Sequence, residues 1–138
     1  MTGTGMVGIL LMTHAPLGEA FLAAVAHVFR SSVEHLEAID VVADQDLGDV
    51  QALAAAAIKR LDDGSGVLVI TDVKGGTPAN CCNKLADAGH VEVIAGISLP
   101  MLLRAITYRM DTLDVVVEMA LAGAQSGAVR VDNRIRVN

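Results

Sequence analysis

Aromatic and positively charged residues are scarce in this sequence. It has no tryptophan, one tyrosine and two phenylalanines, and its formal net charge at pH 7 is −6. A protein that binds nucleic acid needs a basic stripe that releases counterions from the phosphates, and binding of single strands also uses aromatic stacking platforms. Because both features are missing, we expect no nucleic-acid partner.

Long apolar runs and early basic residues are also absent. No apolar run approaches the roughly eighteen residues that span a bilayer. The first basic residue is Arg30, so the start of the chain does not resemble a secretory signal. The adjacent Cys81 and Cys82 form neither a disulfide framework nor a C-x-x-C metal hook. We interpret them as buried apolar residues, with redox chemistry as the alternative, and expect a cytoplasmic location.

Small aliphatic residues make up most of what is present. Of the 138 residues, 53% are hydrophobic and 19% are charged, which is typical of a globular domain. A core of Ala, Val, Leu and Ile suits parallel strands buried between helices. We find no repeat, linker or second domain, so residues 1–138 are interpreted as one domain.

Short apolar runs alternate with segments of helical periodicity along the chain. The runs predict strands at Met6–Met12, His35–Ala43, Val67–Thr71 and Val91–Ile97. The periodic segments predict helices at 16–28, 50–61 with Asp46 or Asp49 as cap, 78–88 after a Gly75–Pro78 turn, and 99–108. A last helix runs through residue 124 with Thr112 as its cap. Strands that alternate with helices across short loops indicate a parallel sheet with right-handed crossovers.

The last ten residues follow a different pattern. Apolar side chains occupy odd positions in residues 129–138 and polar ones occupy even positions, which predicts a strand with one solvated face. No helix precedes it to allow a parallel return, so we expect an antiparallel strand at an edge, either of its own sheet or of a partner's. A frayed terminus is the alternative.

One candidate nucleotide-binding motif is present, but it lacks the structural context that the motif requires. Gly3–Gly8 spells G-x-G-x-x-G, but it leads into the first strand, whereas the dinucleotide fingerprint follows a strand and opens a helix. The sequence also has no G-x-x-x-x-G-K-[ST] loop. Nucleotide chemistry therefore lacks its usual phosphate-binding loops.

His14 and Asp72 each follow a predicted buried strand, the first and the third. In an open α/β sheet, ligands bind at the carboxyl ends of strands where the strand order reverses. If the order is 2-1-3-4, His14 and Asp72 face each other there. A carboxylate that accepts the imidazole N–H fixes the tautomer and leaves the other nitrogen free to attack. The alternative is an ordinary loop histidine, and His27, His35 and His90 are interpreted as structural or solvated.

The turn after Asp72 offers a place for an anion. Gly75 and Gly76 permit positive φ and a close approach of the backbone to a ligand. Thr77 is a natural N-cap with Pro78 at the first helical position, so free N–H groups and a hydroxyl face the crevice. The pattern predicts a site that holds a phosphoryl group on His14 with neither a metal nor a cofactor. Ordinary strand–turn–helix chemistry is the alternative.

Three segments together resemble a known family: GILLMTHAPLGEAFL (8–22), GVLVITDVKGGTPANCCNKL (66–85) and VEVIAGISLPMLLRAI (91–106). They resemble the mannose-family enzyme IIA, the phosphocarrier of the bacterial phosphoenolpyruvate-dependent sugar phosphotransferase system. The resemblance covers nearly the whole chain. It implies an open, doubly wound α/β sheet of four parallel strands in 2-1-3-4 order. It also implies a homodimer with an exchanged antiparallel strand near the C-terminus, for which residues 129–138 are the candidate.

The resemblance also assigns chemical roles. It implies a phosphotransferase component in which His14 takes a phosphoryl group from the phosphocarrier protein HPr through Nε2 while Asp72 holds Nδ1. Thr77 stands where the family has a Ser or Thr that contacts the phosphate. Pro100 and Met101 match its Pro-Met signature beside the active site.

A rim of exposed apolar residues around His14 is the expected docking surface for HPr. The residues predicted for it are Ala15, Pro16, Leu17, Pro100 and Met101. A few dry contacts of this kind suit a transient interface.

A separate IIB protein is the expected acceptor, and contact with a membrane is expected only indirectly, through a permease complex. Two departures leave the acceptor open: no IIB domain follows within the 138 residues, and Lys74 replaces the aromatic or large apolar residue of many transport members. A regulatory phosphoprotein is one alternative. The subunit that supplies phosphate to dihydroxyacetone kinase is another, although the Gly-Gly-Thr-Pro turn fits it less well.

Overall fold

A parallel sheet forms the middle layer of the molecule. The computed structural model describes residues 5–87 and 89–132. Its strands are β1 (Gly8–His14), β2 (Leu36–Val41), β3 (Val67–Thr71) and β4 (Val91–Ala95). All neighbouring pairs are parallel, and the order is β2-β1-β3-β4. The predicted four-stranded parallel sheet and its 2-1-3-4 order are therefore confirmed.

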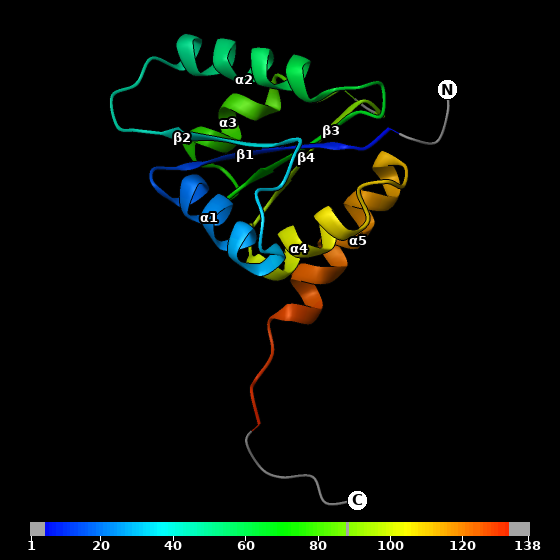
Figure 1. Cartoon of the computed structure of the whole chain (residues 1–138). Helices are drawn as coiled ribbons and strands as arrows, with labels where there is room; N and C mark the ends of the chain where they lie inside the picture. Colours follow the sequence, from blue (N-terminus) through cyan, green and yellow to red (C-terminus); the bar gives the residue numbers. More distant parts are fainter. Residues whose placement is uncertain (1–4, 88, 133–138) are drawn as a thin grey trace, which may run out of the picture.

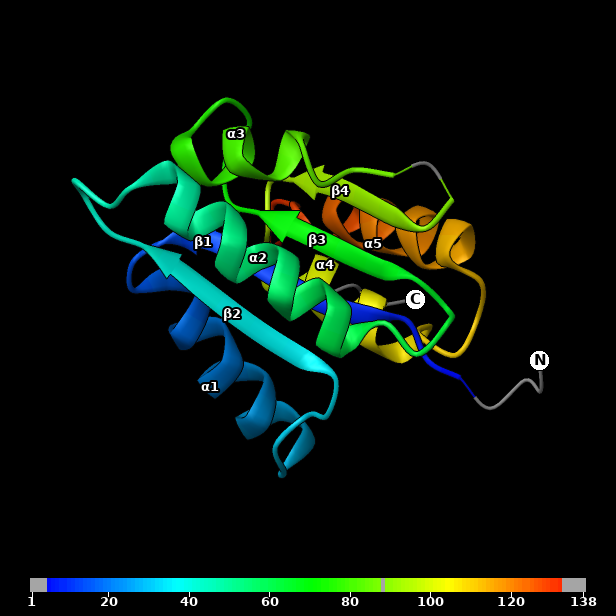
Figure 2. The same ribbon diagram turned by 90° about the horizontal axis from the view of Figure 1, so that it is seen from above.

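Helices cover both faces of this sheet. Helices α2 (Leu47–Leu61) and α3 (Thr77–Asn83) lie on one face, and α1 (Leu17–Phe29), α4 (Leu99–Thr107) and α5 (Leu113–Gly127) lie on the other (Figure 1; seen from above in Figure 2). Asp46 caps α2 by accepting hydrogen bonds from the N–H groups of Gly48 and Asp49. Within the described residues, no helix is both long enough and apolar enough to cross a membrane.

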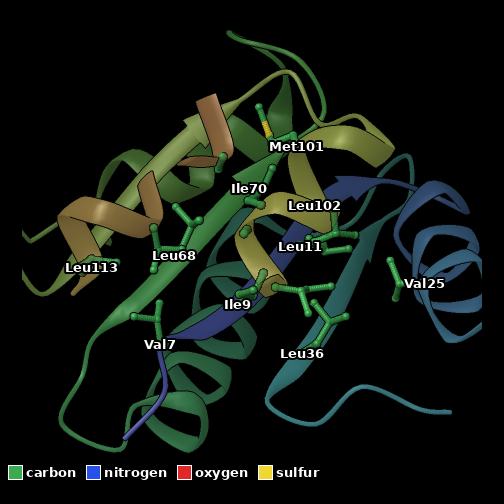
Figure 3. Close-up of a cluster of buried hydrophobic side chains, with 14 residues drawn as sticks. Val7, Ile9, Leu11, Val25, Leu36, Leu68, Ile70, Met101, Leu102 and Leu113 are labelled. Carbon is green, nitrogen blue, oxygen red and sulfur yellow. The ribbon is translucent and has the colours of Figure 1, made fainter. Parts of the chain in front are cut away.

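Alternate residues of β1 fill two separate cores. Ile9 and Leu11 point toward α1, α4 and α5, while Leu10 and Met12 point toward α2 and α3. All four are fully buried. Figure 3 shows the first core, with Leu68 and Ile70 of β3 beside Ile9 and Leu11. Since burying one such side chain stabilises the fold by about 1.5–3 kcal/mol, the central strands are firmly held.

Two helix starts differ by one residue from the prediction. Gly76, not Thr77, is the N-cap of α3, because the N–H of Asn80 donates to the carbonyl of Gly76 at 2.9 Å and this bond begins the helix. Pro16 likewise precedes α1, which begins at Leu17, and the N–H of Ala20 donates to its carbonyl at 3.2 Å. Thr77 is therefore the first residue of its helix, and its hydroxyl is not a capping group.

Helix α3 is shorter than predicted. It ends at Asn83, whereas the sequence pattern extends it to about residue 88. The N–H groups of His90 and Val91 donate to the carbonyl of Asp87, and the N–H of Asp87 donates to that of Val91. These bonds turn the chain into β4. Because they occupy the backbone groups at Asp87, the helix cannot continue through it.

The predicted C-terminal strand lies mostly outside the described residues. Residues 129–132 are irregular, and Val129 and Val131 are strongly exposed, at 67% and 87%. Residues 133–138 are not described. An antiparallel strand formed by residues 129–138 thus stays a prediction.

Candidate functional site

His14 and Asp72 meet at the carboxyl edge of the sheet. Strands β1 and β3 are neighbours, with Met12 paired to Thr71, so the residues that follow lie side by side. The connections from β1 and β3 then run to opposite faces, because α1 and α3 cover different sides of the sheet (Figure 1). This is the point of reversal at which ligands bind in open α/β sheets, as predicted.

Asp72 holds His14 by two hydrogen bonds. Its Oδ2 lies 2.8 Å from Nδ1 of the imidazole and accepts the backbone N–H of His14 at 2.9 Å. Its Oδ1 accepts the N–H of Val73 at 3.0 Å. The side chain of His14 is 53% exposed, and that of Asp72 only 9%. The imidazole is thus held at Nδ1 by a nearly buried carboxylate, while the rest of the ring is open to solvent.

The pKa of Asp72 determines the imidazole tautomer. Burial alone raises this pKa, but the hydrogen bonds from His14 and Val73 outweigh burial and lower the pKa below the usual carboxyl value. Asp72 is therefore ionised at neutral pH and can only accept, so Nδ1 of a neutral His14 carries the proton. The lone pair of Nε2 is then available for attack on an electrophile.

The Gly75–Thr77 turn lies against the free edge of the imidazole. A Cβ added to Gly76 would stand 3.0 Å from Cε1 of His14 and 3.6 Å from Nε2. Gly75 has φ +85, a conformation that favours glycine. Within the described residues, nothing accepts a hydrogen bond from the N–H groups of residues 75–77. The turn therefore presents unused donors beside Nε2.

A cleft opens beside the imidazole. It has a volume of about 380 Å³ and runs between His14, Thr77 and the β2–α2 loop. The residues of this segment that line it are Val41 at the end of β2, Val42, Ala43, Asp44 and Gln45 in the loop, and Leu47 at the start of α2. Sequence reasoning did not select this loop. The 2-1-3-4 strand order could have indicated this loop, because it places the carboxyl end of β2 next to the carboxyl end of β1, where His14 lies.

The predicted docking residues divide into two groups. Ala15, Pro16 and Leu17 are exposed directly after His14. Met101 is only 1% exposed, because the inward face of α4 carries it into the core (Figure 3), so the prediction that it contacts a partner is wrong. Pro100 is exposed, but it lines the groove between α4 and α5 and does not line the His14 cleft.

Other candidate reactive groups are held in structural positions. Cys81 and Cys82 are free and buried, and burial together with the adjacent thiol raises the pKa of Cys82 to about 12. Their interpretation as buried apolar residues is confirmed. His90, which precedes β4, pairs with Asp62 at the opposite edge of the sheet. In the part of the chain that the structure describes, no three His, Cys, Asp or Glu side chains are grouped to hold a metal.

Comparison with known proteins places this chain in one family. The EIIA-man family, described as PTS system fructose IIA component, matches residues 8–121. The chain is 30% identical over 124 residues to the PTS system mannose-specific EIIAB component of Escherichia coli (strain K12), aligning with 88% of this chain and 38% of that protein. The chain thus spans less than two fifths of the length of this curated relative.

Solved structures share the same fold. The mannose/sorbose-specific IIA subunit of the phosphotransferase system from Enterococcus faecalis superposes with a TM-score of 0.81 at 25% identity, covering 96% of this chain and 100% of that one. The phosphotransferase system component EIIA from Streptococcus agalactiae gives 0.80 at 24% identity, with coverages of 91% and 97%. Since the family matches most of the sequence and the fold agrees, this chain belongs to the EIIA-man family of phosphotransferase-system IIA components.

Proposed function

We propose that this protein is a phosphocarrier of the sugar phosphotransferase system, which accepts a phosphoryl group from phospho-HPr on His14 and passes it to a IIB component. The observation that carries the proposal is the 2.8 Å contact between Nδ1 of His14 and Oδ2 of Asp72. It leaves Nε2 as the free nucleophile at a solvent-open edge of the sheet. Family membership supplies the reaction class.

The transfer is a direct displacement at phosphorus between two imidazoles. The lone pair of Nε2 attacks the phosphorus of a phosphohistidine on the donor, and the donor P–N bond breaks with its electron pair returning to the donor imidazole. His14 then carries the phosphoryl group and the Nδ1 proton, and Asp72 stabilises the positive charge on the ring. The second transfer repeats the step, with a cysteine or histidine of IIB as the attacking group.

The Gly75–Thr77 turn binds the phosphoryl oxygens. Its N–H groups are unused within the described residues, and it approaches Nε2 closely at Gly76. The exposed Thr77 hydroxyl adds a donor on the side of the cleft. Fixed donors of this kind stabilise developing charge without reorganisation, which suits a transfer that depends on positioning and electrostatics.

HPr docks on the apolar surface around His14. Ala15, Pro16 and Leu17 form one side of this surface. The β2–α2 loop and the start of α2 form the other, where Val42 is 54% exposed and Leu47 is 51% exposed. A few apolar contacts of this kind suit partners that must separate after each transfer. Such exchange between soluble partners takes place in the cytoplasm, and the membrane is reached only through the permease complex.

A homodimer is part of the same proposal. Strand β4 lies at the end of the described sheet order, so its outer edge offers backbone groups to a further strand. Residues 129–138 are the segment proposed to pair there, exchanged from a second copy. Sedimentation should give a dimer for the full chain and a monomer for a chain that stops after residue 128. A truncated chain that remains dimeric contradicts strand exchange.

Phosphorylation by the upstream components tests the function. Incubation with labelled phosphoenolpyruvate, enzyme I and HPr should give an acid-labile, base-stable label on the protein. His14→Ala should abolish the label, while His27→Ala, a change at an exposed histidine on α1, should retain it. Retention of the label in His14→Ala overturns the proposal. Rapid passage of the label to a cognate IIB favours transport, whereas its persistence on His14 favours a regulatory phosphoprotein.

A further inference from the structure

We propose that Asp40 is a positioning residue for phosphoryl transfer at His14. Asp40 lies on β2 and bonds both the end of β1 and the first turn of α1. These bonds fix the short segment between β1 and α1, next to the imidazole of His14. The inference rests on His14 as the phosphorylated residue. Asp40 bonds Thr13, Gly18 and Glu19 rather than His14 and does not line the cleft, so it acts through its neighbours.

The carboxylate of Asp40 accepts three hydrogen bonds from the residues that flank the β1–α1 connection. The hydroxyl of Thr13 donates to Oδ1 at 2.7 Å, the N–H of Gly18 donates to Oδ1 at 2.8 Å, and the N–H of Glu19 donates to Oδ2 at 3.1 Å. Thr13 is fully buried and pairs with Asp40 across the β1–β2 register. One side chain thus connects both ends of the connection.

Helix α1 depends on this carboxylate for its cap. Pro16 is the N-cap residue of α1 and makes no side-chain capping bond. Asp40 supplies that cap from another strand, and glycine at position 18 makes its approach possible. A Cβ on Gly18 would stand 2.6 Å from Oδ1 of Asp40 and 2.9 Å from Oγ1 of Thr13. The close fit shows that residue 18 and the carboxylate form one packed unit.

Only residues 15–17 separate His14 from Gly18, so a shift of the helix start is transmitted to the backbone of His14. His14 itself is fixed by Asp72, and Ala15 donates its N–H to the carbonyl of Val41 at 3.0 Å. Release of the Asp40 bonds would free one end of a short connection. A displacement of about 1 Å at a reacting centre can cost about a hundredfold in rate.

Asp40 also determines which side of the crevice receives the phosphoryl group. Helices α1 and α3 both begin at this edge of the sheet. The first-turn N–H groups of Gly18 and Glu19 are already bonded to Asp40, and its negative charge neutralises the positive end of α1. The donors at residues 75–77 are left for the phosphoryl oxygens. The start of α1 therefore offers no free N–H at Gly18 or Glu19 that would compete with the Gly75–Thr77 turn.

The test compares transfer rates from phospho-HPr in four proteins. Asp40→Asn should lower kcat by about tenfold to a hundredfold with little change in KM, because the docking surface is intact while the nucleophile is misplaced. Thr13→Val removes one of the three bonds and should lower kcat in the same direction by less. Asp62→Asn is the matched control, since Asp62 accepts the N–H groups of Gly64 and Gly66 at the far edge of the sheet. It should leave kcat unchanged.

A spectroscopic measurement separates positioning from simple loss of stability. Nitrogen NMR of His14 should show the Nδ1–H tautomer in the wild type and in Asp62→Asn, and a mixture of tautomers in Asp40→Asn and Thr13→Val. If Asp40→Asn does not fold, Thr13→Val, which keeps the shape of the side chain, decides the question alone. Wild-type kcat and tautomer in a folded Asp40→Asn or Thr13→Val overturn the inference. Labelling of His14→Ala would instead overturn the proposed function.

Discussion

Oδ2 of Asp72 lies 2.8 Å from Nδ1 of His14, although 58 positions separate the two residues in the sequence. The same oxygen also accepts the backbone N–H of His14 at 2.9 Å. One carboxylate atom therefore fixes both the main chain and the ring of the nucleophile. Rotation of the imidazole would break the ring contact, and Nε2 is consequently held toward the Gly75–Thr77 turn.

Replacement of Asp72 by asparagine should slow phosphoryl transfer without preventing it. A hydrogen bond to a charged group contributes about 1.5–3 kcal/mol, so loss of the carboxylate predicts a rate about tenfold to a hundredfold lower. Single-turnover transfer from phospho-HPr measures this directly. A folded Asp72→Asn protein that reacts at the wild-type rate would show that the carboxylate does not activate His14.

The two glycines of the turn should respond differently to alanine. Gly76→Ala introduces a Cβ 3.0 Å from Cε1 of His14, at an unstrained φ of −79, and should lower the transfer rate with little loss of stability. Gly75→Ala meets no atom within 4 Å but has φ +85, and should lower the free energy of unfolding by about 1–2 kcal/mol. Urea denaturation and transfer kinetics on both variants measure these effects. A Gly76→Ala protein that loses stability but transfers at the wild-type rate, together with a Gly75→Ala protein that keeps its stability but transfers slowly, would contradict the account.

The stability conferred by Asp72 should depend on pH in the acidic range. Burial alone would raise its pKa, but the hydrogen bonds from His14 and Val73 outweigh burial, and the pKa lies below the usual carboxyl value. A depressed pKa in the folded state contributes stability above the unfolded value of about 3.9, and this contribution is lost as the pH falls through the folded value.

The corresponding experiment compares the wild type with Asp72→Asn. The difference between their free energies of unfolding should be constant from neutral pH to about pH 5 and should shrink below about pH 4. Denaturant titrations at several pH values measure it. A difference that stays the same at the lowest pH where both proteins fold would show that this carboxyl group is not stabilised in its ionised form.

Arg109 should be a major determinant of stability far from the site. Its side chain is 6% exposed, and the guanidinium donates to the backbone carbonyls of Val7, Glu34 and His35 at the amino edge of the sheet. Arg109→Met removes the guanidinium from all three carbonyls, of which, among the described residues, only that of His35 keeps another donor, the N–H of Ile9. The change should lower the free energy of unfolding by about 2–5 kcal/mol. Arg60→Met is the control, because Arg60 is exposed and bonded to Glu37 at the surface. Equal losses in the two variants would contradict this role for Arg109.

The sequence predicted the sheet well because its central strands are continuous buried runs. Residues such as Leu10 and Ile70 have no exposed face, and the reversal between β1 and β3 follows from the 2-1-3-4 order that the family resemblance implied. His14 and Asp72 were therefore predictable as a pair. The 2.8 Å contact between them confirms this prediction.

Features that depend on packing between elements were not predictable in the same way. Met101 was predicted to be an exposed docking residue, yet it lies on the inward face of α4 and is buried in the core. The role of Asp40 depends on its pairing with Thr13 in the adjacent strand, and no local pattern indicates it. The cleft beside the β2–α2 loop also requires the tertiary structure. Local periodicity indicates which residues form strands, whereas contacts at strand ends determine the site.

The attachment point of the phosphoryl group tests the central claim most directly. The protein should be phosphorylated with phosphoenolpyruvate, enzyme I and HPr, and then analysed by phosphorus and nitrogen NMR with labelled histidine. Because Asp72 occupies Nδ1, the account predicts a single phosphohistidine at Nε2 of His14 that is absent from His14→Ala. A phosphoryl group on Nδ1, or on any residue other than His14, would contradict it.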